Sequence, residues 1–271
     1  KLEADSVDLF YLSSADPNTD IEDTLAGVQQ LHSEGKIKEF GLAGFPAAMV
    51  DEIWQRCKKR GMLLPTVYQG MYNVISRELE QEIIPKAREL GIRLHVCSPL
   101  AGGLLTGRYV KLEDVSGAME GRFSTRFDDA LGSTVKAGTE LYRSIYARPA
   151  IFDGMDVLRR ACSPEIPPNA NDEADAVLTE ESDSTVGGIR VRVEIREVAP
   201  RQAAVASGEN MGQVALRWLL HHSCLAAGDG IVIGVSGQSQ LVTNLVAWSA
   251  GPLPEHLAHA CEAAWEAVRV G

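Results

Sequence analysis

The sequence has little positive charge and no long apolar run, and these absences exclude several classes of protein. Its 271 residues include 26 Lys and Arg against 37 Asp and Glu, a formal net charge of -11. Nucleic acids and anionic membranes are poor partners for such a field. No apolar run approaches the roughly 18–20 residues of a membrane span, and the opening KLEADSVD is too acidic for a secretory signal.

Cysteine pairs and several common catalytic motifs are also lacking. The chain has five cysteines, an odd number with wide spacing and no CxxC, which predicts neither a disulfide framework nor a zinc site and fits a reducing cytoplasm. No GxGxxG follows a predicted strand, and neither a P-loop nor an HExxH is present. The GVSG around Ser236 lacks the final spacing of GxSxG. We therefore expect no metal centre.

What the sequence does contain is a repeated pattern of short apolar runs followed by segments of helical periodicity. The runs begin at Val7, Ile37, Thr66 and Leu94, about 30 residues apart, which is the length of one strand, one helix and two loops. A fifth strand is expected at 231–235. The predicted helices cover 47–60, 78–90, 211–222, 239–247 and 254–268, and a further one begins at a capping box of Thr19 and Glu22 and ends at Gly35.

The connection between the fourth and fifth strands is long for a compact domain. Within it, 162–189 contains no Lys or Arg but many acidic residues and three prolines, a composition that predicts disorder. The strictly alternating segment 189–196 could form an edge strand. The whole block could equally be an inserted or mistranslated segment without a place in the fold. Five strands are too few for a closed eight-stranded barrel, and a partial barrel exposes two edges.

Two loops after predicted strands have the composition of phosphate-binding segments. In 98–108, Gly102 and Gly103 permit close backbone approach and Arg108 offers a forked cation. In 236–244, the start of a helix provides N–H groups and a positive dipole end. Each alone is more often a structural turn, but together they favour a phosphorylated ligand. At the end of the third strand, Tyr68 and Tyr72 could stack on a planar ring or equally pack in the core.

Several longer strings resemble the aldo/keto reductases, in the branch of the aflatoxin aldehyde reductases and their fungal secondary-metabolism relatives. They are VDLFYL (7–12), GKIKEFGLAGF (35–45), LPTVYQGMYN (64–73), SPLAGGLLTGRY (98–109), GRF (121–123), ALRWLLHHS (215–223) and IVIGVSGQSQLVTNL (231–245). The match is collinear over nearly the whole chain except about 162–200. The resemblance implies a TIM (β/α)8 barrel that binds extended NADP(H) without a Rossmann domain.

The resemblance also assigns roles to individual positions. It places Gln69 against the nicotinamide carboxamide and Arg122 near the cofactor. Along the pyrophosphate it places residues of the glycine-containing loop, namely Ser98, Leu100, Gly102, Leu104 and Arg108. Around the adenosine 2′-phosphate and adenine it places Ser236, Gln240 and Asn244. Tyr142 matches a position that lines the substrate pocket.

The departures from the family pattern concern catalysis. The family uses an Asp, a Tyr and a Lys from the first three barrel strands, and this chain begins after them. The family His is replaced by Ser13, the Ser-Asn pair after the fifth barrel strand by Ala43 and Gly44, and a substrate-binding Arg by Ile145. We therefore identify no catalytic residue. We expect one domain over 1–271, a partial barrel lacking the first three strands, with 162–200 an inserted, disordered acidic segment.

The resemblance implies an NADP-dependent oxidoreductase that reduces an aldehyde or ketone in secondary metabolism or detoxification, located in the cytoplasm. The resemblance does not decide whether the protein forms a homodimer. As an incomplete polypeptide, the chain is expected to be inactive, and Ser13→His is not expected to rescue it. The alternatives are a cofactor-binding pseudoenzyme or interaction subunit, and the product of a decayed gene.

Overall fold

The computed structural model describes residues 4–118, 121–124, 133–162, 182–186, 189–193, 210–235 and 237–271. It divides into two compact units. Unit 1 comprises Lys1–Tyr72, Arg77–Ser98 and Cys224–Ile233, and unit 2 comprises Asn73–Ser76, Pro99–Ser223 and Gly234–Gly271.

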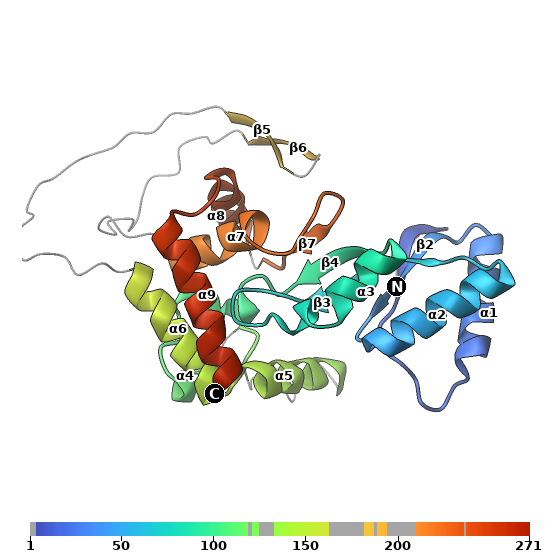
Figure 1. The fold of residues 1–271 in the computed structure, drawn as a ribbon, viewed down its shortest axis with the longest axis horizontal. Helices are drawn as coiled ribbons and strands as arrows, with labels where there is room; N and C mark the ends of the chain where they lie inside the picture. The colour runs from blue at the N-terminus through green and yellow to red at the C-terminus, as the bar shows by residue number, and fades with distance from the viewer. Residues whose placement is uncertain are drawn as a thin grey trace, which may run out of the picture. The chain divides into compact units, whose positions relative to one another are not determined.

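Unit 1 is built on a parallel sheet of five strands in the order β1-β2-β3-β4-β7 (Figure 1). The strands are β1 (Val7–Leu12), β2 (Ile37–Ala43), β3 (Pro65–Met71), β4 (Arg93–Cys97) and β7 (Gly230–Val232). The helices that connect the first four are α1 (Ile21–Ser33), α2 (Ala47–Arg60) and α3 (Ile83–Leu90), the last preceded by a short 3-10 turn, η1 (Glu78–Glu80). This is the repeated strand and helix unit that the spacing predicts.

Apolar residues that point to one face of the sheet form the core of this unit. Phe40 and Leu42 of β2 and Leu94 and Val96 of β4 are all buried, with at most 1% of each exposed. Leu25 of α1, together with Ile53 of α2 and Ala87 of α3, is buried to the same degree, so that the helices cover the sheet. Alternate residues of each strand point to the opposite face.

The sheet is strongly curled, as a hydrogen bond across its concave side shows. The hydroxyl of Tyr11 on β1 and Nδ1 of His95 on β4 lie 2.7 Å apart, although β2 and β3 separate their strands. Three strand spacings of about 4.8 Å would keep the two backbones roughly 14 Å apart in a flat sheet. The Tyr11 ring lies close over Gly41 of β2, where a Cβ would be 2.7 Å from Cε1 of the tyrosine.

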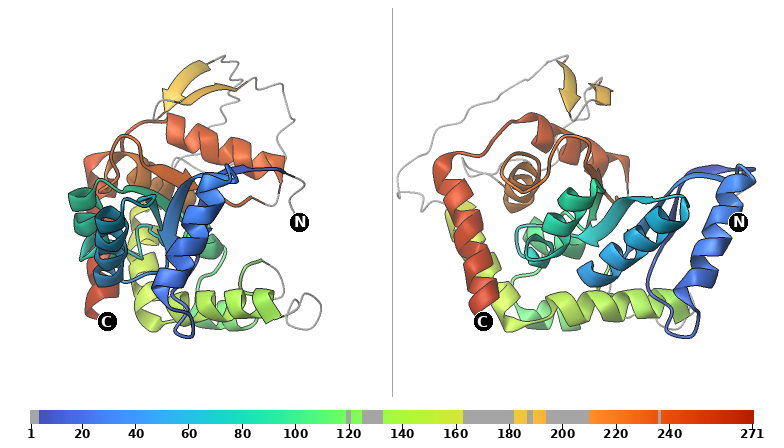
Figure 2. Two further views of the ribbon diagram at one scale, coloured as in Figure 1. Left: turned by 90° about the vertical axis from the view of Figure 1, so that its right-hand side faces the viewer. Right: turned by 45° about the vertical axis from the view of Figure 1, so that its right-hand side comes forward.

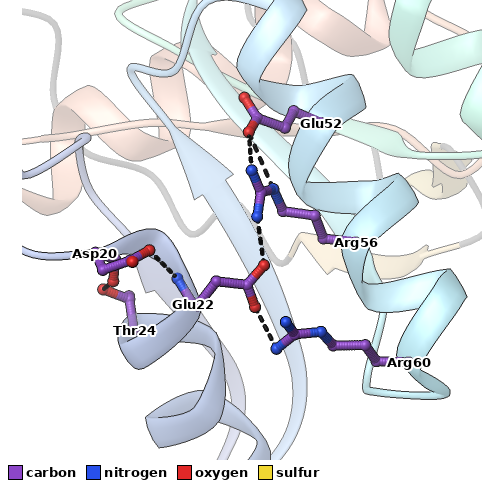
Figure 3. Close-up of polar contacts among 6 residues, drawn as sticks. All are labelled: Asp20, Glu22, Thr24, Glu52, Arg56 and Arg60. Atoms are coloured by element: carbon purple, nitrogen blue, oxygen red, sulfur yellow. Dashed lines mark hydrogen bonds and ion pairs between the residues drawn. The ribbon is translucent and has the colours of Figure 1, made fainter.

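On the outer side of unit 1, α1 and α2 are joined by an ion-pair network centred on Glu22 (Figure 3). One Glu22 carboxylate oxygen accepts from Arg56 and the other pairs with Arg60. Arg56 also pairs with Glu52 one turn earlier on α2, at 2.6 Å. The Glu22 side chain is only 21% exposed, which makes this pairing more favourable than those at fully exposed sites.

Three local predictions are corrected by the structure. The N-cap of α1 is Asp20, which accepts from the Glu22 N–H, whereas the Thr19 hydroxyl bonds to Asp16. The helix predicted at 78–90 is divided, because Pro85 cannot donate the backbone bond that a helix through 81 requires. The fifth strand ends at Val232 instead of 235, because its partner β4 ends at the residue paired with it.

Unit 2 consists mainly of helices. They are a 3-10 helix η2 (Ala101–Thr106) and the α-helices α4 (Leu112–Ser116), α5 (Ser133–Tyr146), α6 (Pro149–Cys162), α7 (Met211–His221), α8 (Gln238–Ser249) and α9 (Glu255–Val270). Figures 1 and 2 show α6 and α9 side by side. Gly154 of α6 permits this approach, because a Cβ there would lie 2.7 Å from the Ala264 carbonyl oxygen of α9.

Part of the block predicted to be an insertion forms a hairpin of two antiparallel strands, β5 (Ser182–Val186) and β6 (Ile189–Val193). The strand expected in the alternating segment is therefore confirmed, and it pairs with β5. The rest of 163–200 lies outside the described residues, so that the expectation of disorder there stays a prediction. None of the helices in the described ranges is both long and apolar enough to cross a membrane.

The parallel strands, the alternating helices and the curl together define an α/β fold of the TIM-barrel type. In such folds ligands bind at the carboxyl ends of the strands. The loops that follow β3, β4 and β7 lie at these ends.

Candidate functional site

The loop after β4, residues 98–108, contains Gly102 and Gly103 and is the glycine loop of this protein; its backbone is unusual. Among the described residues, the only non-glycine positions with positive φ are Ser98 (60°) and Ala101 (50°), both in this loop. Gly102 and Gly103 follow with φ of 67° and 102°. Non-glycine residues in this region cost about 1–3 kcal/mol each, and such strain gathers at ligand sites. The binding role predicted for 98–108 thus falls on the most strained non-glycine backbone among the described residues, and it stays a prediction.

Within unit 2, this loop lies against a cluster of aromatic rings. A Cβ on Gly102 would be 2.9 Å from Cδ1 of Tyr142 and 3.2 Å from Cε2 of Phe123, so that any larger residue collides. The Phe123 ring packs edge-on against Tyr142 at 6.2 Å and against Tyr146 at 6.5 Å between centroids. Tyr146 is fully buried, and its hydroxyl accepts from the Asn73 amide at 3.0 Å.

Two exposed arginines lie on the same unit. Arg122, in the segment 121–124, stacks over the Tyr142 ring with its Cζ 4.6 Å from the centroid. Arg108 ends the glycine-containing loop, and a Cβ on Gly121 would lie 4.0 Å from its Nη1. The structure thus brings together four predicted residues or their segments: Gly102, Arg108, Arg122 and Tyr142. A guanidinium is well suited to the oxygens of a phosphate.

The other predicted loop residues have less obvious roles. Leu104 is fully buried and Leu100 half-buried, so that a ligand could reach Leu104 only through its backbone. On α8, Gln240 is exposed in the first turn and Asn244 is buried one turn later. Ser236 lies outside the described residues.

In unit 1, Gln69 and Ser98 lie near the carboxyl ends of β3 and β4. Gln69 is half-buried and pairs in register with Ala43 on one side and His95 on the other. His95 also faces β7, where a Cβ on Gly230 would be 3.0 Å from its ring. Burial and then the neighbouring Arg93 lower the pKa of His95, which keeps the ring neutral at neutral pH.

The tyrosines at the end of β3 pack in the core. Tyr68 donates to the Phe45 carbonyl oxygen at 2.9 Å, and burial raises the pKa of its hydroxyl. Tyr72 is fully buried, donates to Glu80 at 2.5 Å and accepts from the Cys224 N–H at 3.2 Å. Burial likewise raises the pKa of Tyr72 far above its usual value. Neither ring has the exposure that stacking on a ligand requires.

Ser13, which the resemblance places at the family's histidine position, directly follows β1 and is exposed. A Cβ on Gly44 would lie 3.2 Å from the Ser13 carbonyl oxygen, so that the loops after β1 and β2 meet there. Gly44 has a φ of 72°, which glycine adopts without cost. Among the described residues, no group of three or more His, Cys, Asp or Glu side chains could hold a metal ion.

The geometry defines a class of protein: a TIM-barrel-type fold with a strained, arginine-flanked glycine loop after a strand. Comparison with known proteins identifies it further. The model of the aldo/keto reductase family matches residues 1–266, and the chain belongs to this family. The family prediction is thereby confirmed.

The relatives include mammalian and fungal proteins. Human aldo-keto reductase family 7 member A3 is 38% identical over 272 residues, covering 99% of this chain and 67% of the relative. Rat aflatoxin B1 aldehyde reductase member 2 is 35% identical, covering 99% and 60%. The aldo-keto reductase pigE of Monascus ruber is 29% identical, covering 99% and 64%. The chain thus spans about two thirds of the length of the relatives it matches.

Sequence reasoning missed three residues that shape these surroundings. Arg143 of α5 donates to the Phe123 carbonyl oxygen at 2.6 Å and so fixes the segment that carries Arg122. Tyr11 and His95 meet across the concave side of the sheet. No spacing rule relates residues on different elements, and the only signal for Arg143 was its place next to Tyr142, which the family resemblance assigns to the substrate pocket.

Proposed function

We propose that this protein is an NADP(H)-dependent reductase of aldehydes or ketones. The observation that supports the proposal best is the loop after β4, with its left-handed residues and the exposed Arg108 at its end, together with the exposed Arg122 on Tyr142, whose ring contacts Gly102 of the loop. Such a loop is shaped for an anion, and a dinucleotide phosphate is the anion that aldo/keto reductases require. NADPH, when bound, supplies the hydride that reduces the carbonyl carbon.

The chain's own residues would then bind the cofactor and orient it and the substrate. Arg108 and Arg122 bind phosphate oxygens, and Gly102 lets the loop backbone lie directly against the Tyr142 and Phe123 rings. Ser98, Leu100 and Leu104 contribute through the loop backbone, Gln69 holds the nicotinamide amide, and Ser236, Gln240 and Asn244 serve the adenosine end. We propose that the Tyr142 hydroxyl faces the substrate. The Ser13 hydroxyl can donate one hydrogen bond to a carbonyl oxygen but lacks the reach of an imidazole.

The test is cofactor binding, followed by NADPH fluorescence. We expect the wild type to bind NADPH more tightly than NADH and Arg108→Ala to weaken NADPH binding roughly ten- to a hundredfold, because a charge-assisted bond contributes about 1.5–3 kcal/mol. Arg160→Ala, which removes an exposed arginine from α6, is the charge-matched control and should bind normally. Equal binding of both cofactors, unaffected by Arg108→Ala, would overturn the assignment.

A second candidate is a cofactor-binding pseudoenzyme or interaction subunit, favoured by the serine at position 13. The two candidates differ in turnover. A reductase consumes NADPH in the presence of reactive aldehydes such as 4-nitrobenzaldehyde or succinic semialdehyde, whereas a pseudoenzyme binds NADPH without consuming it.

The absence of any disulfide among the five cysteines supports a place in the reducing cytoplasm.

A further inference from the structure

Among the described residues, Arg122 is held by an aromatic ring, that of Tyr142. Its guanidinium lies 4.6 Å from the centroid of Tyr142, and no carboxylate among the described residues pairs with it. Several other exposed or half-exposed arginines have acidic partners, such as Arg56 with Glu52 and Arg269 with Glu266. An arginine with an acidic partner is largely neutralised, whereas one stacked on a ring keeps its full charge and its N–H edge.

The ring that holds Arg122 is itself fixed from several sides. Tyr142 packs against Phe123 at 6.2 Å and Tyr146 at 5.7 Å between ring centroids. The backbone of Gly102 fills another side so closely that a Cβ would be 2.9 Å from the ring. Tyr142 therefore contacts both the glycine loop and Arg122.

The next residue of α5 fixes the backbone that carries Arg122. The Arg143 side chain donates to the Phe123 carbonyl oxygen at 2.6 Å, one residue beyond Arg122. Two consecutive residues of α5 thus define the position of one guanidinium, one through the backbone and one through the ring. A side chain that is already ordered loses less entropy when an anion binds.

We propose that Tyr142 is a positioning residue for the cofactor phosphate: its ring holds Arg122 beside the glycine loop, through a contact that does not neutralise the charge of the guanidinium. This inference rests on the proposed NADP(H) function and adds to it. It assigns the ring of Tyr142 to cofactor binding, separately from the hydroxyl, for which we propose contact with substrate. It predicts that cofactor affinity depends on the electron density of the ring.

The experiment replaces Tyr142 by phenylalanine and by phenylalanines with one, two and three ring fluorines, and measures NADPH affinity by fluorescence titration. Fluorine withdraws electron density from the ring face with little change of shape. We expect Tyr142→Phe to bind NADPH as the wild type does. The fluorinated series should weaken binding step by step, to a total of about three- to tenfold. Leu141→Ala, at an exposed neighbour on α5, is the control and should have no effect.

A double-mutant cycle completes the test. Tyr142→Leu should weaken NADPH binding in the wild type but not in an Arg122→Gln background, because the ring acts through that guanidinium. A flat fluorine series, or equal effects of Tyr142→Leu in both backgrounds, would overturn the inference while leaving the proposed function intact. Should Tyr142→Leu fail to fold, the fluorine series alone decides. If the wild type itself does not bind NADPH, the proposed function fails, and this inference fails with it.

Discussion

Two neighbouring glycines, Gly102 and Gly103, both have left-handed backbone, but only Gly102 touches aromatic rings. A Cβ on Gly103 would meet nothing within 4 Å, whereas one on Gly102 would press on Tyr142 and Phe123. Both positions therefore carry the left-handed penalty of about 1–2 kcal/mol for any other residue. The difference between the same substitution at Gly102 and at Gly103 therefore measures the cost of pressing a Cβ against the Tyr142 and Phe123 rings.

We predict that Gly102→Ala lowers the free energy of unfolding and NADPH affinity more than Gly103→Ala does. Displacing packed rings adds about 1–3 kcal/mol to the backbone strain. Denaturant unfolding and NADPH titration of the two variants measure the difference. Equal losses in both variants would mean that the aromatic cluster gives way without cost, and the close approach at Gly102 would then have no functional meaning.

Among the elements, α6 and α9 approach each other at Gly154, where a Cβ would lie 2.7 Å from both the Ala264 carbonyl oxygen and Cγ2 of Val268. We predict that Gly154→Ala destabilises the protein by about 1–3 kcal/mol, although alanine favours helix formation, because the helices must separate. Gly27→Ala on α1, where nothing lies within 4 Å, should stabilise by about 0.5–1 kcal/mol. Urea unfolding measures both, and stabilisation by both changes would contradict the close packing.

β7 is joined to its neighbours by one carboxylate. The Asp229 side chain is 2% exposed and accepts from the N–H groups of Leu94 and Ala226, each at 2.8 Å, and from both terminal nitrogens of Arg88. Burial alone would raise the pKa of Asp229, but the bonds from Arg88, Ala226 and Leu94 outweigh it and lower that pKa below its usual value. Because the folded pKa lies below the unfolded one, Asp229 stabilises the fold above the unfolded pKa of about 3.9. That stability is lost as the pH falls through the folded pKa.

We predict that Asp229→Asn costs about 2–3 kcal/mol at neutral pH, since the buried side chain at position 229 loses the charge that accepts from Arg88 and from two backbone N–H groups. The difference from the wild type should shrink as acid protonates Asp229 itself. Asp8→Asn, which breaks an exposed pair with Lys38, is the control and should change the unfolding midpoint little at any pH. A difference that persists unchanged in acid would show that Asp229 contributes through shape and not through charge.

For the whole molecule, the sequence predicted the strands and helices of unit 1 better than several helices of unit 2 or the contacts between elements. The starts of β1 and β2 and both bounds of α2 agree with the prediction, because continuous apolar runs and a terminal glycine are local signals. In contrast, α4, α5 and α6 lie in the long connection after β4, for which no helix was predicted. The cap of α1 was misjudged because Thr19 and Asp20 both fit an N-cap, and the choice depends on Asp16, which binds the Thr19 hydroxyl. The loop after β4 was predicted from composition, but its left-handed residues and its contact with Tyr142 come from tertiary packing.

The Tyr11 and His95 hydrogen bond has a consequence for the order of folding. It joins residues 84 positions apart, and β2 and β3 must lie in place before the two side chains can meet. A contact that requires a finished sheet forms after the transition state. We predict that Tyr11→Phe speeds unfolding several-fold and leaves the folding rate unchanged, because a lost bond of about 0.5–1.5 kcal/mol then appears only in the unfolding limb.

Stopped-flow measurements over a range of denaturant concentrations give the folding and unfolding rates separately. Thr66→Val, which removes a 2.6 Å bond to Glu39 on the adjacent strand, provides the comparison and should slow folding in part. If Tyr11→Phe slowed folding instead, the sheet would already be curled in the transition state. The bond therefore forms when the row of strands curls into a barrel-like arc. The effect of Tyr11→Phe on the folding and unfolding rates would show whether this curling comes before or after the transition state.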